Sequence, residues 1–491
     1  MKVSFAAHEM GADAKAAAQE LFDKEISGFS IDSRTVGEGE LFFALSPEDY
    51  ARHGFTGAAT AADAHLFISD ALAQGAAAAV ARRERVAGDA SLEALRSRLI
   101  VVEDCIEALQ VLAQKLIARW GRPVVGITGS AGKTTTKDLT AHVLGVAGRR
   151  VLRSRKNYNN ELGLPLSILQ MVTQGADPSD FDVAVLEMGM STPREIARLV
   201  EIAPPDVGVE LLVAPVHLEF FGTVEAIAEA KAQLVDGIKE GGTAVLNADD
   251  ERVAAMRARH ASKGLVMTFG IEHAADVSAR DIETGGLGLT RFTLRTPQGE
   301  ARSELTMPGG HNLMNALASA AVATCFGLKP EEIAGALKTA APSQMRGEVL
   351  RFREGFTLVD DSYNSNPRSL LSMVEAVAQG GENVKRKVVV AGEMLELGPE
   401  APSMHREAGR EIGGLGVDVL WGVRGLAVEL VEGAREGGMG EEATRFFESS
   451  EEAADALAGF VRAGDLVLVK GSRGVQTDKV VKLLKERYER Q

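Results

Sequence analysis

The stretch Pro123-Val-Val-Gly-Ile-Thr-Gly-Ser-Ala-Gly-Lys-Thr-Thr-Thr136 predicts a short strand that runs through a glycine loop into a helix. Val124–Thr128 is an apolar run of strand length, and apolar residues recur at helical spacing over Leu139–Leu144. A glycine loop before a helix directs backbone N–H groups and the positive end of the helix dipole at one place, which suits a phosphate. Lys133 adds a point charge for the β- or γ-phosphate, and Thr134 offers a hydroxyl to Mg²⁺.

The loop departs from the usual pattern G-x-x-x-x-G-K-[ST], because Ile127 stands where the first glycine would be. What remains is T-G-x-x-G-K-T-T over residues 128–135, a variant of the same device. The alternative is a turn rich in Gly and Thr that binds nothing, and the flanking strand and helix argue against it. The motif predicts a nucleotide and leaves the chemistry open.

Length and charge limit the classes of protein that fit. With 491 residues the chain is too long for one ordinary core, and about 150 residues per domain suggests roughly three domains. An apolar share of 45% and a charged share of 25% are typical of a soluble globular protein. The net charge of −15 argues against a general binder of nucleic acids or anionic membranes, although a local basic pocket for phosphates is compatible with it.

Cysteine usage and the lack of long apolar stretches predict a reduced, cytoplasmic, soluble protein. Cys105 and Cys325 lie far apart in apolar, helix-like segments, so we expect buried free thiols. No window holds 18 uninterrupted apolar residues, and residues 1–8 lack a signal-peptide pattern. We therefore expect no membrane insertion and no nucleic-acid partner.

Alternation of strand and helix patterns divides the chain into three α/β domains. Residues 1–104 mix short strands with Ala-rich helices. Residues 105–341 open with an amphipathic helix over Glu107–Trp120 and then alternate, and residues 342–491 start the alternation again. Glu432–Glu442, rich in Gly and Glu, predicts a surface loop.

Most predicted strands are apolar on both faces, which is typical of a parallel sheet covered by helices on both sides. The segment from about 275 to 308 alternates apolar and polar residues instead, and predicts a small antiparallel addition. We expect a small N-terminal α/β domain, a central P-loop domain with a doubly wound, mostly parallel sheet, and a C-terminal Rossmann-like α/β domain. Strands are expected at Leu41–Leu45, Ala77–Val80, Leu99–Val102, Val124–Thr128, Val183–Leu186, Val207–Leu212, Thr243–Leu246, Leu265–Phe269, Thr357–Val359, Lys387–Ala391, Asp418–Trp421 and Leu466–Val469.

Polar side chains follow two central strands, at the edge where such sheets bind ligands. Glu187 ends a buried strand one unit after the phosphate loop, which is the place of a carboxylate that holds Mg²⁺. His217 follows the next strand, and imidazole is a second-choice ligand for Mg²⁺, which prefers oxygen. The alternative for Glu187 is a solvated strand-end residue, and the alternative for His217 is a polar residue with satisfied hydrogen bonds. Lys231 has the sequence context of an ordinary lysine on a helix surface.

Polar residues nearer the C-terminus fit nucleotide or substrate binding. Asn312 and Asn315 are three residues apart, so both amides lie on one helix face and offer the donor and acceptor of an adenine edge. Capping is the alternative for Asn312. Arg346 follows the domain boundary, where its fork fits a phosphate as well as it fits a plain surface position. Asp360-Asp-Ser-Tyr-Asn-Ser-Asn-Pro367 fits a binding site at a strand end, or a capped turn into the next helix.

Taken together and in this order, the motifs resemble those of the Mur ligases, the ATP-dependent amide-forming enzymes of peptidoglycan synthesis. The resemblance covers about residues 25–485. Its shared markers are Thr128-Gly-x-x-Gly-Lys-Thr-Thr135, Asn157-Tyr-Asn-Asn160, Glu187, His217-Leu-Glu-x-Phe-Gly222, Ala230-Lys231, Asn247-x-Asp-Asp250 and Gly310-His-Asn-x-x-Asn-Ala316.

Within the family, three segments resemble the member that adds D-alanyl-D-alanine. Asp360-Asp-Ser-Tyr-Asn-Ser-Asn-Pro-Arg-Ser369 is similar to its signature D-x-Y-N-[AS]-N-P. Ala391-Gly-Glu-Met-Leu-Glu-Leu-Gly398 and Lys470-Gly-Ser-Arg473 agree with it. The resemblance implies a ligase that activates UDP-N-acetylmuramoyl-tripeptide with ATP, through an acyl phosphate, and joins it to D-alanyl-D-alanine.

The resemblance also implies roles for individual residues, with Mg²⁺ as cofactor and an N-terminal domain that holds the UDP-sugar. The implied ATP-binding residues are Gly129, Ser130, Ala131, Gly132, Lys133, Thr134, Thr135, Asn312, Asn315, Arg346 and Asp361. The implied catalytic residues are Lys133, Glu187, His217 and Lys231. The implied metal ligands are Thr134, Glu187, His217 and, if CO₂ has converted it to a carbamate, Lys231. The implied substrate-binding residues are Ser33, Arg34, Asn157, Asn159, Asn364, Asn366 and Lys470.

Two other functions are alternatives. Another amino-acid-adding Mur ligase or a folylpolyglutamate-type synthetase would share the ATP site but not the acceptor, and residues 360–369 argue against it. A P-loop switch without ligase chemistry would hydrolyse nucleotide slowly, without needing an amine. We expect small-molecule substrates and a monomer.

Overall fold

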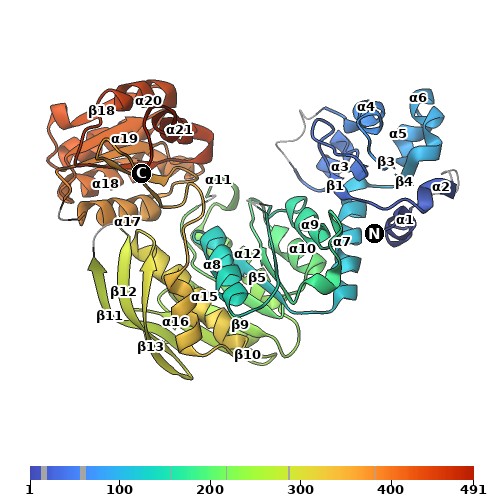
Figure 1. Ribbon diagram of the computed structural model, residues 1–491, viewed down its shortest axis with the longest axis horizontal. Helices are drawn as coiled ribbons and strands as arrows, with labels where there is room; N and C mark the ends of the chain where they lie inside the picture. Colours follow the sequence, from blue (N-terminus) through green and yellow to red (C-terminus); the bar gives the residue numbers. More distant parts are fainter. Residues whose placement is uncertain (13–18, 56–61, 156–157, 217, 286–287, 382) are drawn as a thin grey trace.

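Three α/β units follow one another along the chain, with the central unit between the other two (Figure 1). Each unit has its own sheet. The computed structural model describes residues 1–12, 19–55, 62–155, 158–216, 218–285, 288–381 and 383–491.

The N-terminal unit is built on a four-stranded parallel sheet in the order β1-β2-β3-β4. Its strands are β1 (Gly28–Ser30), β2 (Glu40–Phe43), β3 (Ala78–Arg82) and β4 (Leu99–Val102). Its helices are α1 (Val3–Glu9), α2 (Gln19–Phe22), α3 (Pro47–Arg52), α4 (Ile68–Ala73), α5 (Arg83–Ala87) and α6 (Ala90–Ala94).

The central unit has a nine-stranded sheet in the order β13-β12-β11-β10-β9-β8-β5-β7-β6. All pairs from β6 through β11 are parallel, and β12 and β13 extend the sheet as antiparallel strands. The phosphate-loop strand β5 therefore lies between β8 and β7, and the ends of these three strands meet at one edge. The strands are β5 (Val124–Thr128), β6 (Val151–Arg153), β7 (Val183–Glu187), β8 (Val207–Glu210), β9 (Thr243–Asn247), β10 (Leu265–Gly270), β11 (Val277–Gly285), β12 (Leu289–Thr296) and β13 (Gly299–Thr306).

Helices cover both faces of this sheet. One face packs against α8 (Lys133–Val146), α15 (Gly310–Cys325) and α16 (Pro330–Lys338). The opposite face packs against α7 (Cys105–Trp120), α10 (Glu195–Ile202) and α12 (Val224–Asp236). The remaining helices of the unit are α9 (Gly163–Ile168), α11 (Leu218–Phe221), α13 (Glu251–Ala255) and α14 (Arg257–His260).

Helix α7 links the first two units. The Asp104 carboxylate caps its first turn, and Gly121, at φ 68°, ends it in the left-handed conformation. Its apolar residues join one buried cluster that holds side chains of both α1 and the central sheet. The boundary expected at residue 105 thus precedes a helix that both units share.

The C-terminal unit has a six-stranded sheet in the order β14-β15-β19-β16-β17-β18, parallel except for the antiparallel edge strand β14. Its strands are β14 (Glu348–Arg351), β15 (Thr357–Asp361), β16 (Arg386–Gly392), β17 (Val419–Val423), β18 (Thr444–Phe447) and β19 (Asp465–Lys470). Its helices are α17 (Pro367–Ala378), α18 (Ala401–Gly414), α19 (Ala427–Glu436), α20 (Ser450–Ala458) and α21 (Asp478–Arg487).

The expected fold class is confirmed, and three details differ. The strands β1, β6, β14 and β18 were not predicted, because each is only three or four residues long and lies at the edge of its sheet. The loop expected over Glu432–Glu442 is wrong in its first half, since α19 extends to Glu436. Both cysteines are free thiols, but only Cys105 is fully buried, whereas Cys325 is half-buried. Among the described helices, none is both long and apolar enough to cross a membrane.

Candidate active site

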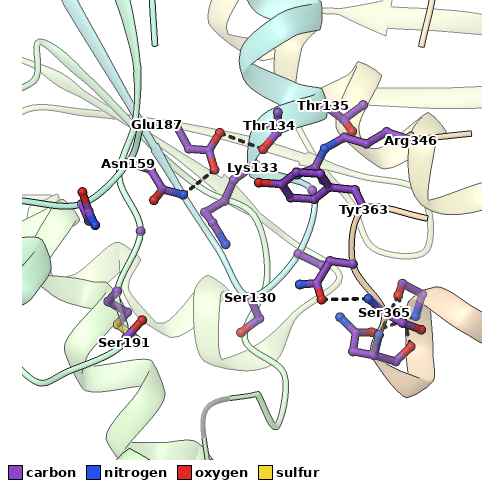
Figure 2. A pocket seen from close by; sticks show the side chains of 18 of the residues that line it. Ser130, Lys133, Thr134, Thr135, Asn159, Glu187, Ser191, Arg346, Tyr363 and Ser365 are labelled. Atoms are coloured by element: carbon purple, nitrogen blue, oxygen red, sulfur yellow. Dashed lines mark hydrogen bonds between the residues drawn. The ribbon is translucent and has the colours of Figure 1, made fainter. Parts of the chain in front are cut away.

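All three units contribute to one cavity of about 630 Å³ at the carboxyl edge of the central sheet. The phosphate loop and the end of β7 form its floor, and the C-terminal unit forms the opposite wall (Figure 2). The sequence-predicted residues that line it are Ser130, Ala131, Gly132, Lys133, Thr134, Thr135, Asn159, Glu187, Asn312, Asn315, Arg346, Asp361, Asn364, Asn366 and Lys470.

The phosphate loop needs its two glycines. Gly129 and Gly132 have φ angles of 150° and 84°, and a Cβ at Gly132 would lie 2.3 Å from the Asn315 Oδ1 atom. The loop passes directly into α8, whose first N–H groups face the cavity. Lys133 Nζ donates a 2.8 Å hydrogen bond to the Gly129 carbonyl oxygen, and burial lowers the pKa of Lys133. Loop, helix end and ammonium together form a place for phosphate oxygens.

Glu187 is fixed by hydrogen bonds at the end of β7. Its Oε2 atom accepts from Thr134 Oγ1 and its Oε1 atom from Asn159 Nδ2, both at 2.8 Å (Figure 2). Its backbone N–H donates to Ser154 Oγ at 3.0 Å. Only 2% of the residue is exposed. The carboxylate is therefore oriented before any ligand arrives.

The pair of Thr134 and Glu187 suits Mg²⁺. This ion prefers oxygen, and in phosphate sites it is held by one or two protein groups while water and phosphate fill its other positions. Within the described residues, no group of three or more His, Cys, Asp or Glu side chains is arranged to hold a metal. Two oxygen ligands beside a phosphate loop meet the requirement without such a group. His217, the third predicted ligand, lies outside the described residues.

The expectation that Lys231 lies on a helix surface is wrong. The residue is 2% exposed, because α12 turns it toward the sheet together with Ile227 and Leu234. The spacing of these three residues along the helix was the signal that local context hid. Burial and the nearby Lys133 lower the pKa of Lys231 to about 7, although Glu210 acts to raise it.

Sequence reasoning also missed Glu210, the last residue of β8. It is fully buried, and neither carboxylate oxygen has a hydrogen-bond partner among the described residues. Thr128, its neighbour in the β5 register, is equally buried and its hydroxyl is likewise unpartnered. Burial raises the pKa of Glu210 to about 8 against the opposing charges of Lys231 and Lys133. Its position matches that of Glu187, which was the available signal.

Asn312 and Asn315 lie together beside the phosphate loop. Asn315 donates to Asn312 Oδ1 at 3.1 Å and accepts from Thr136 Oγ1 at 3.3 Å. Asn312 donates to the Pro308 carbonyl oxygen at 2.6 Å. The capping alternative for Asn312 is wrong, because Gly309 is the N-cap of α15.

The wall from the C-terminal unit carries two cations. Arg346 stacks on the Tyr363 ring, with the guanidinium carbon 4.1 Å from the ring centroid. Lys470 Nζ donates to Asp361 Oδ2 at 2.6 Å and to the Asn364 carbonyl oxygen at 2.9 Å. These contacts bring the ends of β15 and β19 together at the cavity.

Not every predicted substrate residue is placed in the cavity. Asn366 lines it, but its side-chain oxygen caps α17 by accepting from Ser369 N at 2.9 Å, so the capped-turn alternative holds for that atom. Ser33 and Arg34 lie in the turn after β1, where Arg34 pairs with Asp32 at 2.7 Å, and do not line this cavity. Asn157 lies outside the described residues.

Comparison with known families gives matches over the central and C-terminal units. Residues 127–323 match the Mur ligase middle domain, and residues 345–473 match the Mur ligase, glutamate ligase domain.

Relatives match over nearly the whole chain. The UDP-N-acetylmuramoyl-tripeptide–D-alanyl-D-alanine ligase of Bacillus subtilis is 32% identical, over 94% of this chain and 93% of its own. The protein of that name from Escherichia coli is 31% identical, over 94% and 95%.

Solved structures agree with these matches. MurF from Acinetobacter baumannii has a TM-score of 0.81 at 27% identity, with 98% of both chains covered. MurF from Thermotoga maritima, in complex with ADP, has a TM-score of 0.74 at 30% identity, with 94% and 97% covered. Folylpolyglutamate synthase from Mycobacterium tuberculosis, at 16% identity and a TM-score of 0.59, shares the fold alone.

Proposed function

The chain belongs to the Mur ligase family, and we propose that its three-walled cavity is where it joins D-alanyl-D-alanine to UDP-N-acetylmuramoyl-tripeptide with ATP. It is an ATP-dependent ligase of peptidoglycan precursor synthesis. The observation that carries the proposal is that one cavity holds both the phosphate loop with its oriented Glu187 and the polar end of β15, which bears the signature of residues 360–369.

The phosphate loop binds ATP in this proposal. The N-terminal N–H groups of α8 and the Lys133 ammonium face the β- and γ-phosphates, and Arg346 faces them from the opposite wall. Asn312 and Asn315, which lie on the loop's other side, supply amide groups for the adenine edge. Asp361 meets the ribose or the metal from the end of β15.

Thr134 and Glu187 would hold one Mg²⁺, and His217 would contribute to a second metal position. Bound there, the ion would offset the negative charge of the phosphate oxygens. The protein's own share is orientation: Asn159 and Thr134 hold the Glu187 carboxylate in one direction.

Two substitution steps account for amide formation. A carboxylate oxygen of the tripeptide attacks the γ-phosphorus, and ADP leaves. The amine of D-alanyl-D-alanine then attacks the acyl carbon, loses a proton and displaces phosphate. Carboxylate and ATP are both anionic, so Lys133 and Arg346 are needed to bring them together. Orienting three substrates in one cavity supplies several further kcal/mol of the acceleration.

Lys231 would be the lysine that reacts with CO₂. Its lowered pKa leaves a large share of the side chain as uncharged amine, which is the form that attacks CO₂ with loss of a proton. The resulting anion would gain from the nearby positive charge of Lys133, which disfavours the ammonium form of Lys231. A carbamate helps to hold a metal, whereas an ammonium would repel it.

Asn364, Asn366 and Lys470 would bind the dipeptide side, whereas Ser33, Arg34 and Asn157 would bind the UDP-sugar side. We further propose that the protein acts as a monomer in the cytoplasm, where ATP and UDP-sugars are available.

Phosphate release with a panel of amines tests this function. With ATP and UDP-N-acetylmuramoyl-tripeptide, we expect release to require D-alanyl-D-alanine and to yield one phosphate per amide formed. Glutamate, lysine and diaminopimelate should give only background release. Equal release with glutamate would favour a glutamate-adding synthetase, and release without any amine would favour a nucleotide switch.

A further inference from the structure

A buried imidazole joins the N-terminal unit to the central unit at the mouth of the cavity. His53 follows α3 and lines the cavity. Its Nε2 atom lies 3.2 Å from Asp104 Oδ1, and its Nδ1 atom lies 3.6 Å from Glu161 Oε2. All three side chains are at least 85% shielded from solvent. The ring thus bridges the start of α7 and a loop of the central unit.

The two carboxylates make His53 a cation. Burial acts to lower the pKa of His53, but the hydrogen bonds and charges of Asp104 and Glu161 raise it to about 9. Asp104 is already held, because it caps α7 by accepting from the backbone N–H groups of Ile106 and Glu107. Glu161 is the partner contributed by the central unit.

The loop that carries Glu161 also carries Asn159, which orients Glu187. Asn159 Nδ2 donates to Glu187 Oε1 at 2.8 Å, and the Asn159 carbonyl oxygen accepts from Gly189 N at 2.7 Å. Two residues later, the Glu161 carbonyl oxygen and Oε2 atom both accept from Gln110 Nε2, at 3.1 and 3.2 Å. One short segment therefore touches the Glu187 carboxylate at one end and the N-terminal unit at the other.

We propose that His53 and Glu161 are a pair of positioning residues that sets the N-terminal unit at a fixed place against the phosphate loop. The N-terminal unit holds the UDP-sugar end in the proposed function, on which this inference rests. The substrate's carboxylate lies at the far end of the same molecule. A shift of the unit would move that carboxylate away from the γ-phosphate, so the pair acts through substrate placement and not through contact with the reacting atoms.

Removing the charge of Glu161 tests the pair. Glu161→Gln keeps the size of the side chain and an acceptor for Gln110, so the fold should persist. We expect the KM for the UDP-substrate to rise about tenfold, which is of the order of losing one ion pair that is mostly shielded from solvent. ADP binding in the absence of the UDP-substrate should stay as in the wild type, which a general loss of structure would not leave intact.

A second variant tests whether His53 and Glu161 act through their mutual contact or independently. His53→Gln should raise the same KM at least as much, because it also removes the contact with Asp104. The double variant should raise the KM no further than His53→Gln alone, because that change has already removed the contact with Glu161. Glu48→Gln is the matched control: this exposed carboxylate of the N-terminal unit pairs with Arg85 and does not line the cavity. Its KM values should equal those of the wild type.

The outcomes distinguish this inference from the proposed function. A wild-type KM in Glu161→Gln, or losses in the double variant that multiply, would overturn the pair while the ligase activity stands. Equal losses in ADP binding and in UDP-substrate binding would overturn it too, because they would mark a structural defect. A wild-type protein that fails to ligate would overturn the proposed function instead.

Discussion

Glu187 and Glu210 occupy matching places at the ends of two strands, and their hydrogen-bond partners differ. Each is the last residue of a parallel strand that pairs with β5, opposite Ile127 and Thr128 respectively. Both are buried. Glu187 accepts hydrogen bonds from Thr134 and Asn159, whereas both oxygens of Glu210 are unpartnered among the described residues.

The face of the sheet explains the difference. Glu187 shares the face of Val183 and Val185, which packs toward α8, so its carboxylate meets the first turn of that helix. Glu210 shares the face of Gly208, where a Cβ would touch Leu234 and Ile238, so it points toward α12 and Lys231. A carboxylate among partners is a prepared ligand. One without partners is a buried acid that favours its proton.

The largest effect is expected at Glu187. Glu187→Gln keeps the shape but removes the negative charge that would face Mg²⁺, so we expect turnover to fall by about 100-fold or more. Asn159→Ala leaves the charge and removes one of its supports, so about a tenfold fall should follow. Initial rates of phosphate release at saturating substrates measure both. Turnover within twofold of the wild type in Glu187→Gln would remove this residue from the metal site.

The next largest effect is expected at Lys231, which lies on the face of the sheet that α12 covers. Lys231→Met fills the same volume but does not react with CO₂, and we expect a loss of about 100-fold in turnover. Wild-type protein equilibrated with ¹³C-bicarbonate should show a carbamate carbon signal by NMR, and the variant should lack it. In Lys231→Ala, which leaves space, a short-chain acid should restore part of the activity. Full activity of either variant would exclude the carbamate role.

The sequence predicted the face that carries hydrogen-bonded ligands far better than the face that carries Lys231. The spacing of Gly132, Lys133 and Thr134 identified the phosphate loop, and Glu187 followed from its place after an apolar strand. A loop motif is local, so its residues are neighbours in the chain and in space. Lys231 was expected on the surface, because the sequence of a helix does not show which of its polar residues the sheet will cover.

The sequence could not predict contacts between residues of three separate elements, because motifs identify only residues that are close together in the chain. His53, Asp104 and Glu161 are far apart in the sequence, and none stands in a motif that indicates the other two. Short strands such as β1 and β6 escaped notice because three residues hold too little periodicity. Their place is fixed by pairing with a neighbouring strand.

The pH dependence of the free energy of unfolding tests whether Glu210, unlike Glu187, keeps its proton in the folded protein. With a folded-state pKa of about 8 and an ordinary value of 4.5, the folded protein keeps a proton that the unfolded chain loses between these pH values. The contribution of Glu210 to stability is therefore intact below pH 4.5 and falls as the pH rises to 8. Glu210→Gln lacks this proton, so its free energy of unfolding should exceed that of the wild type by about 3–5 kcal/mol at pH 8 and by almost nothing near pH 4.5.

Calorimetric unfolding at pH 5 and pH 8 measures this pH-dependent difference in the free energy of unfolding. Glu240→Gln, an exposed change in the same unit, should show no pH-dependent difference from the wild type. A Glu210→Gln protein that is less stable than the wild type at pH 8 would mean that Glu210 is ionised and paired with Lys231. Glu210 and Glu187 would then both be ionised, and they would differ only in the groups that pair with them.

The smallest effect compares the removal of one hydroxyl beside Glu187, from Thr134 in α8, with the removal of one beside Glu210, from Thr128 in β5. Thr134→Val removes a hydroxyl that donates to a charged carboxylate, so we expect a loss of about 1–2 kcal/mol in the free energy of unfolding. Thr128→Val removes a buried hydroxyl without a partner, so we expect no loss and a gain of up to about 1 kcal/mol. Denaturant unfolding without ligands measures both values. If Thr128→Val costs as much as Thr134→Val, the Thr128 hydroxyl has a partner in solution, and the two faces of the sheet are more alike than their hydrogen bonds indicate.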